Sequence, residues 1–194
     1  MLLYVFNILI QFFFQLNNKN VIKINITLIV IQSNMKRYID ALNEIESVQP
    51  SHNQTMKSYM KVLQEIKNEI FNNLSISTTS VCIISQNTKT KDATLKDCLI
   101  KMAINSLAIL SKIKTITIEK IIVSNTKLFE KKNSDYGNSF SDFELIGIIV
   151  RLNDKINRIL NLGAASPEIM QVDEKIEDTI NDLYNYCVIG LMYT

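Results

Sequence analysis

The sequence has little glycine, proline and histidine and no tryptophan. Its 194 residues include four Gly and two Pro, which is low against average usage, so few tight turns can form. A chain of this length buries one good core, and long elements must fill it. We therefore predict a single all-α domain, a helical bundle with a short strand or an irregular N-terminal extension.

The scarcity of histidine and cysteine excludes several kinds of active site. A histidine-rich zinc site cannot be built from one residue, and a Ser-His-Asp triad would have to recruit His52. Three cysteines without CxxC spacing indicate reduced thiols, so we expect a cytoplasmic protein. The glycines form neither a GxGxxG motif nor a P-loop. Carboxylates, Lys and Arg side chains and a divalent ion remain for chemistry.

Charge is unevenly distributed along the chain. From Asp135 onward ten Asp and Glu stand against four Lys and Arg, a net charge of −6, whereas residues 1–134 carry seventeen Lys and Arg against nine acids, a net charge of +8. The basic part contains no dense Lys/Arg run and no basic patch interleaved with aromatics. The sequence thus has no specific nucleic-acid-binding motif.

The N-terminal residues differ from the rest of the chain. Residues 1–16 are very apolar but short for a membrane span, and they lack the basic start and cleavage site of a signal peptide. Residues 21–27 alternate like a strand and lead into apolar residues 28–31. We predict an extension over residues 1–34 and a helical domain over 35–194, with the true start at Met1 or Met35 left open. Membrane contact through residues 1–16 is the less favoured alternative.

Apolar residues recur at helical spacing through most of the remaining chain. The spacing predicts helices over 35–47, 55–74, 95–113, 117–131 and 144–162. Residues 75–90, rich in Ser and Thr, read as a loop with a short strand or turn, and the polar residues 130–140 as an interruption. Ser141 and Glu144 match a capping box at the start of the fifth helix.

The predicted helix 144–162 has one polar face, which carries Arg151, Asp154, Lys155 and Arg158. As a structural feature, these charges form a ladder of ion pairs worth about 0.3 to 0.5 kcal/mol each. As a functional feature, guanidinium groups beside a carboxylate suit a triphosphate with its metal ion. The spacing alone does not decide between these interpretations.

A second polar ladder lies on the predicted C-terminal helix, residues 173–192, with Asp173 as its expected N-cap. Glu174, Asp178 and Asp182 are each four residues apart, so they lie one above the other on the helix. Like charges at this spacing repel each other by roughly a few tenths of a kcal/mol per pair. A solvated acidic face is the plain interpretation. Because large apolar residues interleave with these acids, a lined pocket in which a hard cation supplies the missing charge is the functional one.

Three motifs in the last third of the chain resemble a known family. They are Lys132-Asn-Ser-Asp-Tyr-Gly137, Val150-Arg-Leu-Asn-Asp-Lys-Ile-Asn-Arg158 and Glu177-Asp-Thr-Ile-Asn-Asp-Leu-Tyr-Asn-Tyr186. In this order they resemble the nucleotide modification associated domain family of the first type, found mainly in phages and bacteria. The resemblance covers residues 129–192. It implies an all-α module similar to MazG-like and dimeric-dUTPase-like nucleoside triphosphate pyrophosphohydrolases, which are often homodimers.

The resemblance also implies roles for acidic residues. In the broader superfamily, acids on neighbouring helices hold Mg²⁺ against the triphosphate. Carried over by motif, Asp154, Asp178 and Asp182 look like metal ligands, and Glu174 or Glu177 could serve as the general base. The superfamily's usual pair of glutamates three residues apart has no clear match in the earlier helix, which leaves the number of metal ions open.

The remaining expected site residues would contact the nucleotide. Arg151, Lys155 and Arg158 look like the phosphate-binding face, and Asp135 with Tyr136 looks like a loop that closes the site. The predicted function is Mg²⁺-dependent cleavage of a (deoxy)nucleoside triphosphate to the monophosphate and pyrophosphate. A non-catalytic nucleotide-binding accessory module for nucleotide or base modification is the alternative, and a structural helical protein is another. The preferred base and sugar stay open.

Overall fold

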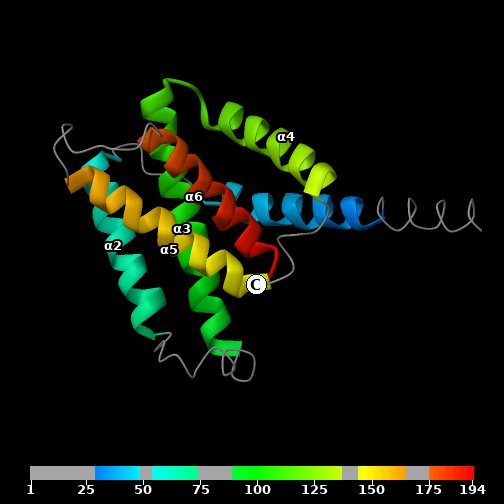
Figure 1. The fold of residues 1–194 in the computed structure, drawn as a ribbon, viewed down its shortest axis with the longest axis horizontal. Helices are drawn as coiled ribbons and strands as arrows, with labels where there is room; N and C mark the ends of the chain where they lie inside the picture. Colours follow the sequence, from blue (N-terminus) through cyan, green and yellow to red (C-terminus); the bar gives the residue numbers. More distant parts are fainter. Residues whose placement is uncertain (1–28, 49–53, 74–88, 137–143, 165–174) are drawn as a thin grey trace, which may run out of the picture.

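The computed structural model describes residues 29–48, 54–73, 89–136, 144–164 and 175–194. Every element in these ranges is a helix, which confirms the all-α prediction for them (Figure 1). The elements are the N-terminal helix (residues 29–46), α2 (Met56–Asn73), α3 (Lys89–Lys114), α4 (Ile118–Tyr136), α5 (Glu144–Ala164) and α6 (Ile176–Leu191). The strands predicted within residues 21–27 and 75–90 lie outside the described residues, except that Lys89 and Thr90 are helical.

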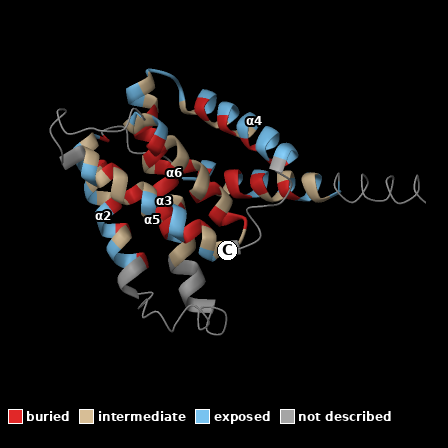
Figure 2. Cartoon of the chain, in the orientation of Figure 1, coloured by how far each residue is buried: buried red, intermediate tan, exposed pale blue. Residues whose placement is uncertain are grey.

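Helix α6 lies at the centre of the bundle, packed between α3 and α5 (Figures 1 and 2). Half of its residues are buried: Thr179, Ile180, Leu183, Tyr184, Cys187, Val188, Gly190 and Leu191. Near its end, Gly190 faces α3 so closely that a Cβ there would lie 3.1 Å from Leu99 Cδ1. Glycine at this position therefore allows the two helices to approach each other.

Helix α2 closes the bundle against α3 and α5. Its apolar stripe, with Tyr59, Leu63 and Ile66, is buried, as the helical spacing predicted. Tyr59 is fully buried, and its hydroxyl lies 2.8 Å from that of Ser106 on α3. The apolar stripe of α2 is therefore part of the hydrophobic core, and the hydrogen bond between Tyr59 and Ser106 is a polar contact within it.

The N-terminal helix packs on the same core through Tyr38, Ala41, Leu42 and Ile45. It is already helical at residue 29, so the helix predicted to start at Met35 begins at least six residues earlier, within the predicted N-terminal extension. Burial of one face against the bundle explains this, because tertiary packing outweighs the weak local preference of a short segment.

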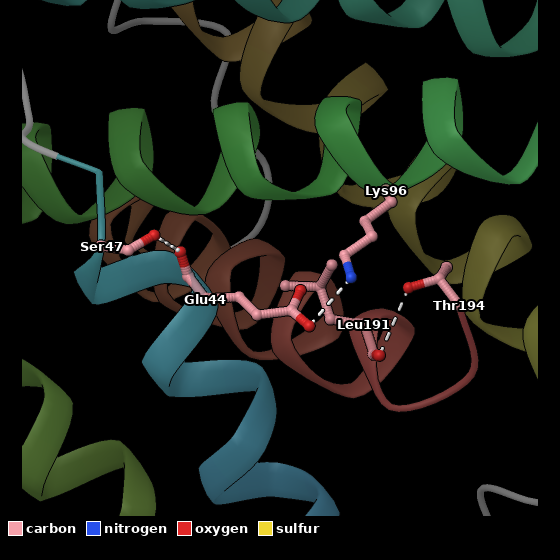
Figure 3. Close-up of polar contacts among 5 residues, drawn as sticks. All are labelled: Glu44, Ser47, Lys96, Leu191 and Thr194. Carbon is pink, nitrogen blue, oxygen red and sulfur yellow. Dashed lines mark hydrogen bonds and ion pairs between the residues drawn. The ribbon is translucent and has the colours of Figure 1, made fainter.

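Polar contacts also tie the N-terminal helix to the end of the chain. Glu44 Oε1 lies 2.9 Å from Lys96 Nζ on α3, beside the end of α6, where the Thr194 hydroxyl donates to the Leu191 carbonyl (Figure 3). The Arg37 guanidinium donates to the carbonyl of Met192. The two ends of the described chain are thus joined directly.

Helix α4 lies apart from the four-helix core and packs on α3 and the N-terminal helix (Figure 1). It continues to Tyr136, so the interruption predicted to start at residue 130 begins later. The reason is Asn133, which is buried and accepts a 3.1 Å hydrogen bond from Asn34 Nδ2. A stacked pair, Tyr38 on Phe129 with ring centroids 4.0 Å apart, adds to this contact.

Among the described helices, none is long and apolar enough to cross a membrane. The apolar residues 1–16 lie outside the described residues.

Candidate functional site on helices α5 and α6

Two of the predicted charged residues meet where α5 packs on α6. Lys155 Nζ lies 2.7 Å from Asp182 Oδ2. The two side chains are 21% and 39% exposed, so the ion pair is only partly shielded from solvent. Helical spacing predicted these residues in two separate rows of charges, one on each helix. The packing of α5 on α6 brings one residue of each row together as an ion pair.

A second contact crosses the same seam one turn away. Arg158 Nε donates to Thr179 Oγ1 over 2.9 Å, and Thr179 is fully buried. Each helix contributes two residues three positions apart, which lie on one face. The higher number on α5 pairs with the lower one on α6, so the helices run antiparallel. Thr179 is not among the residues predicted for the site, because a lone threonine among apolar residues carries no local signal.

Helix α2 contacts a different flank of α5, because at about 100° per residue Asn157 lies far around the helix from Lys155. Lys67 Nζ donates to Asn157 Oδ1, between Lys155 and Arg158 in the sequence. Arg151 and Asp154 are exposed on the preceding turns of α5. The cationic face of α5, next to α6, therefore carries Arg151, Lys155 and Arg158 in a row, with Asp182 opposite.

The three aspartates predicted to bind metal do not come together. Among the described residues, no three His, Cys, Asp or Glu side chains are grouped so that they could hold a metal ion. Asp154 and Asp178 are exposed, and Asp182 is held by Lys155. An ammonium group supplies the positive charge that the sequence analysis assigned to Mg²⁺. The described carboxylates therefore do not fit a metal site formed by these three residues.

The expected general bases lie at or before the start of α6. Glu174 and the expected N-cap Asp173 are outside the described residues, and the residue at the N-cap position is Lys175, which makes no side-chain cap. Glu177 is half-buried in the first turn together with Asp178. Acids in a first turn are stabilised by the helix dipole, which is a sufficient structural reason for both.

Asp135 and Tyr136 belong to a helix, not to the closing loop that the motif suggested. They form the last residues of α4, and Asp135 is exposed. The neighbouring Asn133 is bonded to the N-terminal helix, whereas α4 meets α6 further back, at Asn125. The described end of α4 is thus fixed against the N-terminal helix, and not against the cationic face of α5.

Comparisons with known proteins bear on the same part of the chain. Neither the curated proteins nor the solved structures include a match to this chain. The wider similarity to MazG-like enzymes therefore stays a prediction. Residues 132–193, which hold the end of α4 and all of α5 and α6, match the family model of nucleotide modification associated domain 1, and this confirms the family that the three sequence motifs indicated.

Proposed function

We propose that the cationic face of α5, beside α6, binds the phosphates of a (deoxy)nucleoside triphosphate, and that the protein serves the metabolism of modified nucleotides. The observation that carries the proposal is the coincidence of the family match with this face. The matched residues 132–193 contain Arg151, Lys155 and Arg158, and α6 opposite them.

The spacing of the cations suits a chain of phosphates. Residues three or four apart on a helix have Cβ atoms about 5 to 6 Å apart, so Arg151, Lys155 and Arg158 present three cationic groups along one row. Guanidinium groups bind phosphate oxygens through paired hydrogen bonds, and Lys adds a point charge.

Magnesium has a limited place in the proposal. Proteins usually hold Mg²⁺ with one or two carboxylates together with substrate phosphates, and not with a cage made by the protein alone. We therefore include Mg²⁺ only as the counter-ion of the triphosphate. Cleavage to the monophosphate and pyrophosphate, with Glu174 or Glu177 as the base, stays the finer prediction from the family resemblance.

Titration calorimetry of the full chain with each NTP and dNTP, with and without Mg²⁺, tests the proposal. Arg151→Ala should weaken the binding of the preferred triphosphate by about fivefold, because it removes one exposed charge from the row. The control is Lys127→Ala, which removes an exposed cation from α4 and should leave affinity within about twofold.

Two outcomes would contradict the proposal. In the first, neither the native chain nor the Asp182→Asn variant described below binds any nucleotide, and no nucleotide raises the melting temperature of either protein, although a ligand of the native state must stabilise it. In the second, Arg151→Ala and Lys127→Ala weaken binding equally, which would indicate attraction to overall charge. Pyrophosphate release measured on the same samples decides whether the bound triphosphate is also cleaved.

A further inference from the structure

The ammonium group of Lys155 already has an anionic partner in the protein. Asp182 Oδ2 lies 2.7 Å from Lys155 Nζ, within the distance of a charge-assisted hydrogen bond. Lys155 is the middle cation of the row on α5, with Arg151 one turn before it and Arg158 one turn after. A phosphate group at the centre of this row would compete with the Asp182 carboxylate for the charge of the Lys155 ammonium group.

The pair can open at little cost. Ion pairs near the surface are weak and screened by salt, and this one is partly exposed on both sides. The other contact across the seam differs, because Thr179 is fully buried and offers a neutral hydroxyl to Arg158. The Arg158 contact therefore holds the two helices together, while the Lys155 contact is the exchangeable one.

We propose that Asp182 is an autoinhibitory competitor for the polyphosphate: its carboxylate holds Lys155 in the ligand-free protein and is displaced when phosphate binds. This inference rests on the proposed function. It assigns to Asp182 a role opposite to that of a metal ligand, because the carboxylate opposes nucleotide binding instead of recruiting a cation for it.

The two roles predict opposite effects of one substitution. Asp182→Asn keeps the shape of the side chain and removes its charge. If Asp182 competes for Lys155, affinity for a triphosphate rises about fivefold, because the phosphate no longer has to displace a carboxylate from the Lys155 ammonium group. If Asp182 instead holds Mg²⁺ against the phosphates, the same substitution weakens binding, and only in the presence of Mg²⁺.

The experiment is a double-mutant cycle on the full chain, measured by calorimetry with tripolyphosphate and with each dNTP. The variants are Asp182→Asn, Lys155→Met and the two combined. Asp182→Asn should tighten binding about fivefold in the native background and by less than about twofold once Lys155 is replaced, since the carboxylate then has no cation to withhold. The gain should shrink at high salt. Asp182→Ser is the second variant if the Asn protein does not fold.

Asp40→Asn is the matched control. It removes the same charge from an exposed position on the N-terminal helix, and affinity should stay within about twofold. An equal gain from Asp40→Asn would overturn the inference by showing a general charge effect. A gain from Asp182→Asn that persists in the Lys155→Met background would overturn it as well.

The remaining outcomes separate the inference from the proposed function. If the native chain binds a triphosphate and Asp182→Asn binds it no more tightly, the inference is overturned and the proposed function stands. If the native chain shows no binding and Asp182→Asn does, autoinhibition is supported. If neither binds tripolyphosphate or any dNTP, both proposals are overturned.

Discussion

Several ionisable side chains lie inside the core and carry no charge there. Burial raises the pKa of the Cys98 thiol to about 12, with smaller contributions from Glu69, and it raises the pKa values of Cys187, Tyr59 and Tyr184 as well. Both thiols are buried and free of disulfides, as the reduced-thiol interpretation predicted for them. Because the thiolate is the reactive form, these two cysteines are structural residues.

Stability should therefore fall in alkaline solution. The folded-state pKa of Cys98 is above its ordinary value of 9.0, so the unfolded chain loses the proton first as pH rises. The stabilising effect is complete below about pH 9 and is lost progressively up to about pH 12, at no more than about 1.4 kcal/mol per pH unit for each such group. Urea unfolding at pH 7, 9.5 and 10.5 measures the slope. Cys98→Ala should reduce it, and a free energy of unfolding independent of pH would contradict the expectation.

The buried tyrosines should differ in their response to loss of the hydroxyl. Tyr59 pairs with Ser106, so Tyr59→Phe leaves a buried hydroxyl unpaired and should cost about 1 to 3 kcal/mol. The Tyr184 hydroxyl has no hydrogen-bond partner among the described residues, so Tyr184→Phe should be neutral or stabilising by up to about 1 kcal/mol. Urea midpoints of the two variants compare them directly. Equal destabilisation would show that the Tyr184 hydroxyl has a partner.

At the scale of elements, α4 is attached to α6 by side-chain amides. Asn125 and Asn181 donate to each other over 2.9 Å in both directions, and Asn185 Nδ2 donates to Asn125 Oδ1 over 2.8 Å. Helical periodicity predicted the helix α4 but not its attachment to α6. An asparagine in a sequence pattern indicates an exposed polar position, so the pattern did not predict that Asn125 is buried. Its burial against another helix depends on contacts between residues 56 and 60 positions apart.

Substitution of Asn125 should loosen α4 more than it perturbs the core. Asn125→Ala removes the shared partner of two half-buried amides, of which Asn185 keeps its 3.0 Å hydrogen bond to the Asn181 carbonyl, and this should cost about 1 to 3 kcal/mol. Asn105→Ala is the control, since that partly exposed amide donates only to the Lys101 carbonyl in its own helix, and it should cost less than about 0.5 kcal/mol. Hydrogen exchange should accelerate in α4 before α3 in the Asn125 variant. Uniform acceleration would contradict an attachment specific to α4.

At the scale of the whole molecule, the family segment is part of a larger fold. Residues 132–193 contain α5, α6 and the end of α4, but α6 buries its apolar residues mainly against α3 and α5, and its end contacts the N-terminal helix. Phe129 stacks on Tyr38 from that helix. The segment therefore depends on residues far before it in the sequence for a complete core.

Truncation tests this dependence. Residues 29–194 retain every contact among the described residues and should unfold cooperatively. Residues 54–194 lose the N-terminal helix, and with it Tyr38, the stacking partner of Phe129, and the buried Leu42 and Ile45. They should show the weak near-UV circular dichroism of a loosely packed state. A cooperative transition of 54–194 at the native temperature would contradict this role.

The sequence by itself determined the all-α class, the presence of all six described helices, the ends of α2, α5 and α6 to within about three residues, the buried stripe of α2 and the family of the last third. These properties depend on residue spacing and on motifs within a short stretch of chain. Only the tertiary structure decided which charges meet. Lys155 forms an ion pair with Asp182, and Arg158 donates a hydrogen bond to Thr179. Helix α4 continues to Tyr136, where Asn133 contacts the N-terminal helix. The reason is that a side chain's partner across a helix seam depends on how two distant segments pack, which no local pattern records.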